Sequence, residues 1–303
     1  PPRVDLQLPH AQLHPVGETV PVPPDPDQLA GFDELHDPAP EPMTVLGRNR
    51  QNLHQFPDRG RMTDALANSL DDLAGAVVET LARDAAALEA VAQDCTKAGA
   101  PVALTYPADL SQPGEPARVV DEVMKQTGRI DALVNNAGDT QRGDFLTLTD
   151  EQHLSGFALK YHATVRFCRA AWPHLEASKG AVVNISGIGA HTPEPEFTIG
   201  GPVNSAMINF SKAASKRPGA PRVNVVCPGH IETDRLSRRI DVYAEKHGLS
   251  REAAAEEMRA ELGIAQFGQP GDISAMVRYL CSDQARYITG AVFTVDGGAT
   301  PGI

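Results

Sequence analysis

From about residue 61, the sequence alternates apolar runs of strand length with stretches of helical length. The apolar runs, which predict buried strands, occupy 75–81, 100–111, 130–136, 180–186, 222–227 and 291–297. The stretches with helical periodicity occupy 62–74, 84–99, 115–128, 149–177, 202–215 and 272–282. Strands separated by helices of this length need right-handed crossovers, so the alternation predicts an α/β fold with one doubly wound parallel sheet and helices on both faces. Ligands of such folds bind at the carboxyl ends of the strands.

The length of 303 residues and the hydrophobic content of 41% suit one α/β domain with an extension. We place the domain at 43–303 and the extension at 1–42, where prolines such as Pro21, Pro23 and Pro24 are concentrated. Proline lacks a backbone donor and fixes φ, so this segment can join neither a sheet interior nor a long helix. We expect a Pro-rich extended arm or linker, either poorly ordered or wrapped around a neighbouring subunit.

The formal net charge of -12 argues against nucleic-acid binding, which needs clustered lysine and arginine on one face. The four cysteines are widely spaced, with no Cys-x-x-Cys pair and no histidine spacing suited to zinc, so we expect reduced thiols and no metal site. No apolar run approaches the roughly 18 residues of a membrane span. Residues 1–10 also lack the pattern of a secretion signal. These features predict a cytoplasmic protein that binds neither nucleic acid nor membrane.

Short motifs lie at the ends of three predicted strands. They comprise Asp109; Asn135, Asn136, Ala137 and Gly138; and Pro228 and Gly229, with Thr233 shortly after. Small residues at a strand end leave room for a flat dinucleotide to lie on the backbone. Together with the C-terminal sequence GAVFTVDGGAT, these motifs resemble the short-chain dehydrogenase/reductase family over about residues 60–303. The resemblance implies a Rossmann-like fold that binds NADP or NAD through the motif residues.

The family assigns each motif a role, and each role has a simpler alternative. Asn-Asn-Ala-Gly lines the adenosine and central part of the cofactor site, and Asp109 either bonds the adenine amino group or caps a surface turn. Pro228 and Gly229 either turn the chain beneath the nicotinamide or form a plain turn. Thr233 donates to the carboxamide or a phosphate, or else caps a helix. Arg83 follows the second strand and either binds a ribose 2′-phosphate, which favours NADP slightly, or is a solvated arginine before a helix.

The catalytic residues of the family are absent from their expected positions. In the family, a serine lies 13 residues before the tyrosine of a Tyr-x-x-x-Lys motif. Alignment of the helix at 202–215 puts Gly200 at the tyrosine position and Asn204 at the lysine position. Gly187, 13 residues before Gly200, then occupies the serine position, with Ser186 one residue earlier. Because loss of a positioned general acid lowers a rate by about 10² to 10⁴, the standard mechanism cannot be transferred.

A lysine and an asparagine have exchanged positions relative to the family pattern. Lys160 stands where a structural asparagine is expected, and Asn204 stands where the lysine is expected. In the family these two positions face one polar network, so the exchange keeps an ammonium and an amide in the pocket. We hypothesise that Lys160 supplies the charge or the acid; its alternative role is an ion pair on a helix surface. The expected catalytic residues are Lys160, Ser186 and Asn204. The other candidate helpers are His191, Glu194 and Glu196.

The glycine-rich phosphate loop of the family is missing. The family opens with Thr-Gly-x-x-x-Gly-x-Gly, which brings backbone N–H groups to the pyrophosphate at a helix N-terminus. The candidate segment 44–62 has two glycines, Gly47 and Gly60, thirteen residues apart. Its arginines either hold phosphate by charge or form an exposed basic loop. They are Arg48, Arg50, Arg59 and Arg61.

Two further segments predict assembly and a lid. Residues 157–175 carry apolar and aromatic side chains at helical spacing, which in the family marks a subunit-contact helix, so a homo-oligomer, dimer or tetramer, is expected. Packing within one chain explains the same pattern. Residues 235–262 lie where the family has a variable lid over the substrate, and their charge spacing predicts an exposed helix that closes on the ligand.

Three functions are compatible with these features. The first is an atypical NAD(P)-dependent oxidoreductase that acts on a carbonyl or an alcohol of a small molecule. The second is a binding or scaffold protein that has kept the fold and lost redox chemistry. The third is an enzyme of non-redox chemistry, isomerisation or elimination, with Lys160 or a glutamate as base. The retained motifs favour the first function, and the missing glycine-rich loop favours the second.

Overall fold

The structure is a computed structural model that describes residues 44–48, 77–82, 85–97 and 102–301. All of these residues belong to the unit Glu41–Ile303. The arm predicted at 1–42, the helix predicted at 62–74 and Arg83 lie outside the described residues. Arg50, Arg59, Arg61 and Gly60 lie outside them as well.

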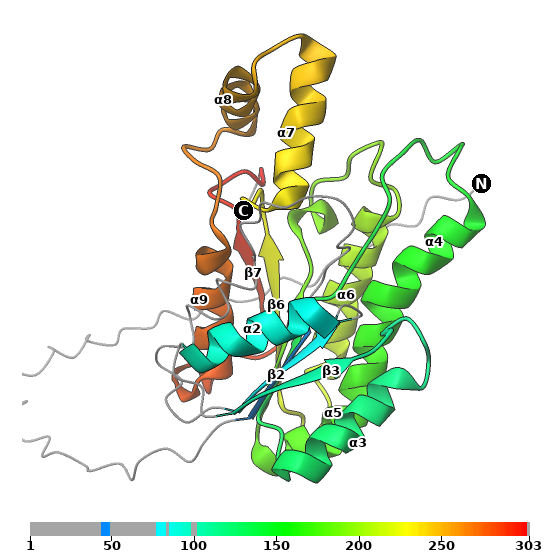
Figure 1. The fold of residues 1–303 in the computed structure, drawn as a ribbon, viewed down its shortest axis with the longest axis vertical. Helices are drawn as coiled ribbons and strands as arrows, with labels where there is room; N and C mark the ends of the chain where they lie inside the picture. Colours follow the sequence, from blue (N-terminus) through cyan, green and yellow to red (C-terminus); the bar gives the residue numbers. More distant parts are fainter. Residues whose placement is uncertain (1–43, 49–76, 83–84, 98–101, 302–303) are drawn as a thin grey trace, which may run out of the picture. The chain divides into compact units, whose positions relative to one another are not determined.

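Within the described residues, seven parallel strands form one sheet in the order β3-β2-β1-β4-β5-β6-β7 (Figure 1). The strands are β1 (Thr44–Arg48), β2 (Val77–Ala82), β3 (Val102–Pro107), β4 (Ala132–Asn135), β5 (Ala181–Ile185), β6 (Arg222–Pro228) and β7 (Val292–Val295). Each of the six predicted strands is present, and β1 adds a seventh between β2 and β4. The order reverses direction between β1 and β4, which is the switch point where open α/β sheets bind their ligands.

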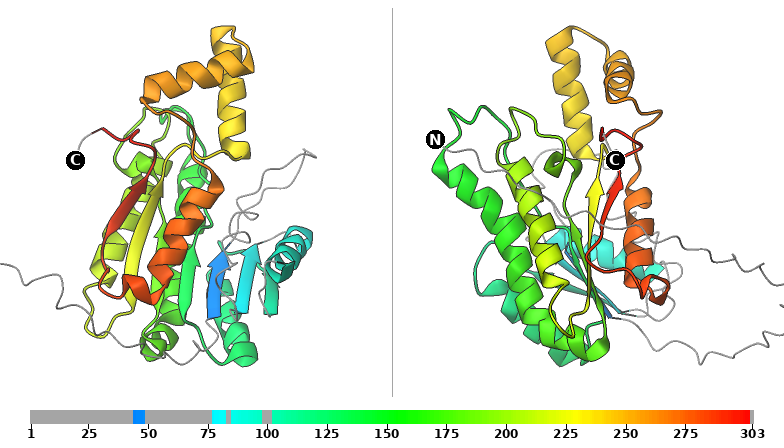
Figure 2. Two further views of the ribbon diagram at one scale, coloured as in Figure 1. Left: turned by 90° about the vertical axis from the view of Figure 1, so that its left-hand side faces the viewer. Right: turned by 180° about the vertical axis from the view of Figure 1, so that it is seen from behind.

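The helices occur where the periodicity predicts them, with ends shifted by a few residues. They are α2 (Ala85–Lys97), α3 (Glu115–Thr127), α4 (Asp150–Phe157), α5 (Ala163–Ser178), α6 (Gly200–Ala214), α7 (Asp234–His247), α8 (Arg251–Leu262) and α9 (Pro270–Cys281). The short turns are η3 (Ala158–His162), η4 (Ile188–Ala190) and η5 (Asp283–Ala285). The predicted insertion at 235–262 therefore forms two helices, α7 and α8, which extend beyond the strand ends in Figure 2.

Alternate residues of the central strands belong to two hydrophobic clusters, one on each face of the sheet. Leu133 and Val182 pack in a cluster with side chains of α3 and α5. Their neighbours Val134 and Val183 pack in a second cluster with α9. Figures 1 and 2 show α3, α5 and α6 on one side of the sheet and α9 on the other. This arrangement confirms the predicted doubly wound sheet, because a strand buried on both faces has no polar side.

The apolar side chains of α5 pack against other elements of the same chain. Phe167, Cys168, Ala171 and Leu175 are each at most 2% exposed and belong to the cluster with α3. Packing within one chain therefore accounts for these residues, and the homo-oligomer stays a prediction. None of the helices in the described ranges is long and apolar enough to cross a membrane.

Gly180 joins α5 to β5 at a point where another strand passes close by. A Cβ at this position would lie 2.3 Å from the backbone oxygen of Asp131. The Gly180→Ala substitution is therefore expected to lower the free energy of unfolding by about 1 to 3 kcal/mol, because the backbone must shift. Urea unfolding measures the change. Gly271→Ala is the control, since nothing lies within 4 Å of its added Cβ, and equal stability of the two variants would contradict the close packing at Gly180.

Candidate active site

The candidate site lies where β4, β5 and β6 end. These strands are adjacent and parallel, so the loops that follow them share one edge of the sheet. The long helix region predicted at 149–177 and the helix α6 supply side chains to the same edge. All three catalytic candidates, Lys160, Ser186 and Asn204, meet there.

Lys160, Ser186 and Asn204 form a connected polar group. The Lys160 Nζ donates to Asn204 Oδ1 over 2.6 Å and to the backbone oxygen of Ser186 over 2.9 Å. The Ser186 Oγ donates to the backbone oxygen of Asn204 over 2.9 Å. The two bonds of the Lys160 ammonium are charge-assisted, and because Ser186 and Asn204 are buried and Lys160 is half-buried, all three bonds are partly shielded from water. We call the contact of Lys160 with Asn204 the lysine–asparagine pair.

Lys160 stands in a turn of π-helix, which interrupts the helix predicted as continuous from 149 to 177. In η3 the Ala163 N–H bonds to the Ala158 oxygen, five residues back. The additional residue widens the turn, so the side-chain stripes of α4 and α5, before and after it, lie on different faces of the helix. α4 before it starts with a capping box between Thr149 and Gln152. Single π-turns occur frequently at functional sites, and here the turn carries the lysine that the sequence singles out.

The space beside Gly200, the tyrosine position of the family, is occupied by the ring of Phe197. α6 begins at Gly200, two residues earlier than predicted, so Gly200 and Asn204 lie one turn apart. A Cβ at Gly200 would lie 2.0 Å from the Phe197 ring, and one at Gly189 would lie 2.6 Å from it. The two glycines therefore make room for the phenyl ring. At the serine position, a Cβ on Gly187 would lie 3.0 Å from Asn204 Nδ2.

The Phe197 ring also meets a charged group. The guanidinium of Arg142 lies 4.6 Å from the ring centroid, and Arg142 forms an ion pair with Glu194. A bond from Gly143 N to the oxygen of Glu196 joins the two loops that carry these residues. Glu194, a candidate helper, thus pairs with Arg142, while Glu196 contributes its main chain. His191 is exposed and donates its backbone N–H to Ile188.

Below the site, buried amides tie the strands to α6. Asn135 Nδ2 donates to Asn184 Oδ1 over 2.8 Å, and Asn184 Nδ2 donates to Ser211 Oγ over 2.8 Å. Asn135 and Asn184 are at most 1% exposed. The Asn135 side chain therefore lies between β4 and β5, and contact with a cofactor stays a prediction for Asn135 and for its neighbours Asn136, Ala137 and Gly138.

The expected nicotinamide side is lined by small residues and backbone. A Cβ on Gly138 would lie 2.8 Å from Cδ of Lys160, so the absence of a side chain there lets the lysine pass. Pro228 ends β6, and Gly229 packs so closely that a Cβ would lie 2.5 Å from Cβ of Asp296. Thr233 precedes α7 and its Oγ1 donates to the Ile231 oxygen over 3.3 Å, without capping the helix.

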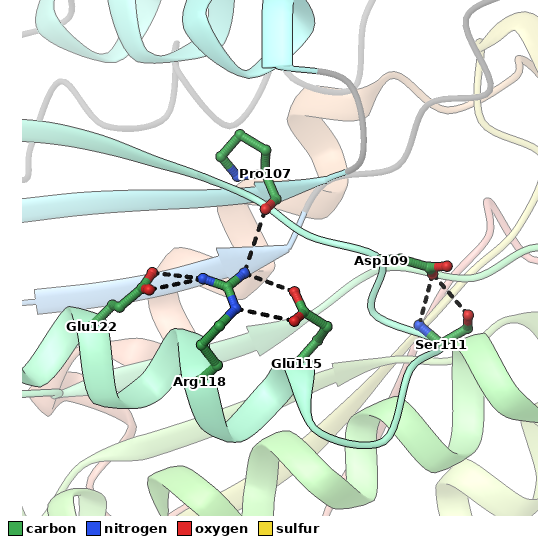
Figure 3. Close-up of polar contacts among 6 residues, drawn as sticks. All are labelled: Pro107, Asp109, Ser111, Glu115, Arg118 and Glu122. Carbon is green, nitrogen blue, oxygen red and sulfur yellow. Dashed lines mark hydrogen bonds and ion pairs between the residues drawn. The ribbon is translucent and has the colours of Figure 1, made fainter.

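Asp109 stabilises the turn after β3. Its Oδ1 accepts from the Ser111 N–H over 3.1 Å and from the Ser111 hydroxyl over 2.7 Å (Figure 3). On the adjacent helix, Arg118 binds Glu115, Glu122 and the oxygen of Pro107, which joins α3 to the end of β3. The turn-capping alternative is thus present in the structure, and the adenine contact of Asp109 stays a prediction.

Buried groups near the site are kept neutral. Burial raises the pKa of the Cys227 thiol, which lies beside Ser186 and the backbone of Gly187. His230 is 8% exposed, and its Nε2 lies 3.0 Å from Nη1 of Arg239. Burial, followed by the charge of Arg239, lowers the pKa of His230 from 6.5 to about 4. Since arginine only donates, Nε2 accepts and the proton of the neutral ring resides on Nδ1.

Sequence reasoning did not identify His230, Arg239, Arg142 or Phe197. The histidine directly after Pro228–Gly229 and the run of arginines after Thr233 were the available signals. Among the residues that the structure describes, no three His, Cys, Asp or Glu side chains are grouped to hold a metal ion. The arrangement offers an ammonium, an amide and a serine hydroxyl at the edge of a parallel sheet, next to small residues.

The sheet order and the position of the site define a dinucleotide-binding type of α/β protein. A family model described as enoyl-(acyl carrier protein) reductase matches residues 62–300. The chain belongs to the short-chain dehydrogenase/reductase family of NAD(P)-dependent oxidoreductases.

Individual relatives agree with this membership. The chain is 32% identical over 228 residues to the 3-oxoacyl-[acyl-carrier-protein] reductase of Chlamydia muridarum, which covers 74% of this chain and 87% of that protein. It is 27% identical over 198 residues to the NADPH-dependent reductase BacG of Bacillus subtilis, covering 64% of this chain and 76% of that one. The L-sorbose reductase of Gluconobacter frateurii, solved with NADPH and L-sorbose, superposes with a TM-score of 0.77 at 24% identity over 87% of this chain and 98% of its own.

The contact between Gly200 and Phe197 is testable by a double-mutant cycle. Alanine in place of a helical glycine normally stabilises by up to about 1 kcal/mol. We expect Gly200→Ala to destabilise the wild-type chain, since its Cβ meets the ring, and to be neutral or stabilising in the Phe197→Ala background. Urea unfolding of the four proteins gives the coupling energy. The same sign of effect in both backgrounds would show that the ring does not occupy this space.

His230 makes stability depend on pH. Because its pKa is lower in the folded chain, the unfolded chain takes up a proton first as the pH falls below about 6.5. Stability is therefore fully present above that pH and is lost down to about pH 4, by up to about 3 kcal/mol. Unfolding free energies measured from pH 4 to 7.5 should show this slope in the wild type and in the His191→Gln control. A slope that persists undiminished in His230→Gln would refute the assignment.

Proposed function

We propose that the protein interconverts a carbonyl and an alcohol of a small molecule with NADP or NAD, and that Lys160 replaces the usual tyrosine and lysine together. The 2.6 Å bond from Lys160 Nζ to Asn204 Oδ1 is the observation that carries the proposal. It supports the idea that the exchanged residues act in one pocket, because their side chains are in direct contact although they are 44 positions apart.

The lysine–asparagine pair suits a reaction in which negative charge develops on oxygen. Asn204 Oδ1 and the Ser186 oxygen orient the ammonium and lower its freedom to move, which is the preorganisation that electrostatic catalysis needs. In the reductive direction, Nζ would donate a proton to the developing alkoxide or stabilise it by charge. The Ser186 hydroxyl, which donates to the Asn204 backbone, holds α6 beside β5 and so keeps Asn204 in place.

The described part of the site fits one half of a nicotinamide dinucleotide. Residues 137 and 138 are small, and the backbone at Gly229 packs against Asp296 with no side chain between. Ala137, Gly138, Pro228, Gly229 and Thr233 would hold the nicotinamide and its ribose, and the bound cofactor would supply or accept the hydride. We favour NADP, because the relatives BacG and L-sorbose reductase are named with NADPH and because of Arg83. The helices α7 and α8 would serve as the lid over the substrate.

A second function is a nucleotide-binding protein without turnover. The Phe197 ring favours it, since the ring fills the space beside Gly200 where the family places its tyrosine. In that case the retained nucleotide side of the site would serve recognition alone. Cofactor binding without chemistry on any carbonyl is the observation that would select this function.

Cofactor binding is the first measurement. Titration of the full chain with NADPH and with NADH, followed by calorimetry and by cofactor fluorescence, should show saturable binding, tighter for NADPH. No binding of either nucleotide at millimolar concentration would exclude both functions. Tight binding with no turnover on a panel of ketones, aldehydes and alcohols would select the second.

Replacement of Lys160 tests the proposed chemistry. Lys160→Met should lower turnover by about 10² to 10⁴, the usual effect of losing a positioned acid, while the Kd for NADPH changes little. Lys125→Met, at an exposed position of α3, is the matched control and should retain full turnover. Unaltered turnover in Lys160→Met would remove the lysine from the mechanism.

A further inference from the structure

Four arginines lie near one another in the loop after β4 and in α7, and the proposed chemistry uses none of them; three are exposed and Arg239 is half-buried. Arg142 is in the loop after β4, and Arg235, Arg238 and Arg239 are in the first two turns of α7. Arg235 lies within electrostatic range of the other three, and Arg239 lies within range of Arg142. We call these four residues the arginine cluster. The whole chain carries a net charge of -12, so basic composition does not explain the cluster.

Three of the four arginines stand at the helix end that disfavours cations. The N-terminus of a helix carries a partial positive charge and unpaired backbone N–H groups. Thr233, the residue before α7, makes no side-chain cap, and its hydroxyl donates to the Ile231 oxygen. Arginines added to this end repel the helix dipole and one another. Such an arrangement is stabilised when an anion binds between them.

A buried histidine orients one member of the cluster. His230 is 8% exposed, and its Nε2 accepts from Nη1 of Arg239 over 3.0 Å. Its other nitrogen, Nδ1, is buried with no hydrogen-bond partner among the described residues. An unsatisfied buried donor is unfavourable, and the bond that the ring does form is the one to Arg239. His230 is thus a positioning residue for the guanidinium.

Carboxylates partly neutralise the arginine cluster, and Glu194 acts on Arg239 as well as on Arg142. Glu194 pairs with Arg142, and Asp139 lies within electrostatic range of Arg235. Asp296 faces His230, but its carboxylate accepts from the backbone N–H groups of Gly298 and Thr300. Asp234 is the acidic residue in the first turn of α7.

A chain of contacts connects the arginine cluster with the lysine–asparagine pair. Arg142 lies over the Phe197 ring, with 4.6 Å between Cζ and the ring centroid. The ring abuts Gly189, and a Cβ on Gly189 would lie 3.5 Å from Nδ2 of Asn204. Asn204 in turn accepts from Lys160. Phe197 therefore lies between Arg142 of the cluster and the turn of Gly189 that adjoins Asn204.

We propose that the arginine cluster binds an anionic group of the substrate, a carboxylate or a phosphate, and so selects anionic carbonyl compounds. The inference rests on the proposed function, because it assumes that the substrate reacts beside Lys160. Planar guanidinium forks match carboxylate and phosphate oxygens in pairs, and Arg239 with its histidine is preorganised for such a contact. Phosphate groups of the cofactor are the other source of the same chemistry, and the test separates the two.

Anion binding can be measured without any turnover. Succinate and inorganic phosphate are titrated by calorimetry into the full chain, with and without saturating NADPH. We expect binding in both states, and a Kd raised about tenfold or more in Arg235→Met and in Arg239→Met, with NADPH affinity unchanged. Arg286→Met, on an exposed turn, is the matched control and should bind like the wild type. Arg239→Lys keeps the positive charge and serves as a second variant at this position in case Arg239→Met does not fold.

Two results would overturn the inference. Anion affinity equal in the wild type and in both arginine variants would show that the cluster binds no anion. Competition between the anions and NADPH, with weaker NADPH binding in the variants, would assign the cluster to the cofactor phosphates.

Turnover gives a second, independent readout. On a 3-oxo acid and its methyl ester, the wild type should prefer the acid in kcat/KM, and Arg239→Met should lose that preference through KM while the ester is unaffected. If the protein binds anions but reduces neither compound, the proposed function fails while the anion site stands. An ester preferred by the wild type would refute selection for anionic substrates.

Discussion

The site depends on a buried chain of hydrogen bonds from Asn135 through Asn184 to Ser211. Amide groups inside a parallel sheet are tolerated only when they are satisfied, and once satisfied they permit one register. Asn135 belongs to β4, Asn184 to β5 and Ser211 to α6, so three elements are fixed together. Ser186 lies two residues beyond Asn184, and Asn204 lies about two turns before Ser211. The meeting of Ser186 with Asn204 is thus a consequence of polar packing one layer deeper.

Strands and helices followed from the sequence because burial and periodicity are local properties. The apolar runs at 130–136 and 180–186 are buried on both faces, and such strands leave a clear pattern. The contact between Lys160 and Asn204 also followed, since exchanged residue types at two positions point to a shared environment. The catalytic role of the pair stays a proposal.

Other parts of the site could not be predicted because they depend on tertiary packing. The position of the Phe197 ring requires open space at both Gly189 and Gly200, which come from different turns of the chain. The contact of His230 with Arg239 joins a turn to the face of a helix, and neither residue has a distinctive local pattern. The bond of Asn135 could not be predicted for the same reason: a side chain at a strand end can point to the ligand or into the sheet, and here it bonds Asn184 in the interior. Its contact with a cofactor stays a prediction.

The π-helical turn at Ala158–His162 has a consequence for how this helix is compared with others. An apolar stripe traced backward from α5 at 3.6 residues per turn arrives one residue out of phase in α4, because the turn holds an additional residue. Alignment of the whole stretch as a regular helix would therefore assign the wrong face to one of its halves. Removing one residue from the turn would rotate Lys160 away from Asn204 while the helix itself remained intact.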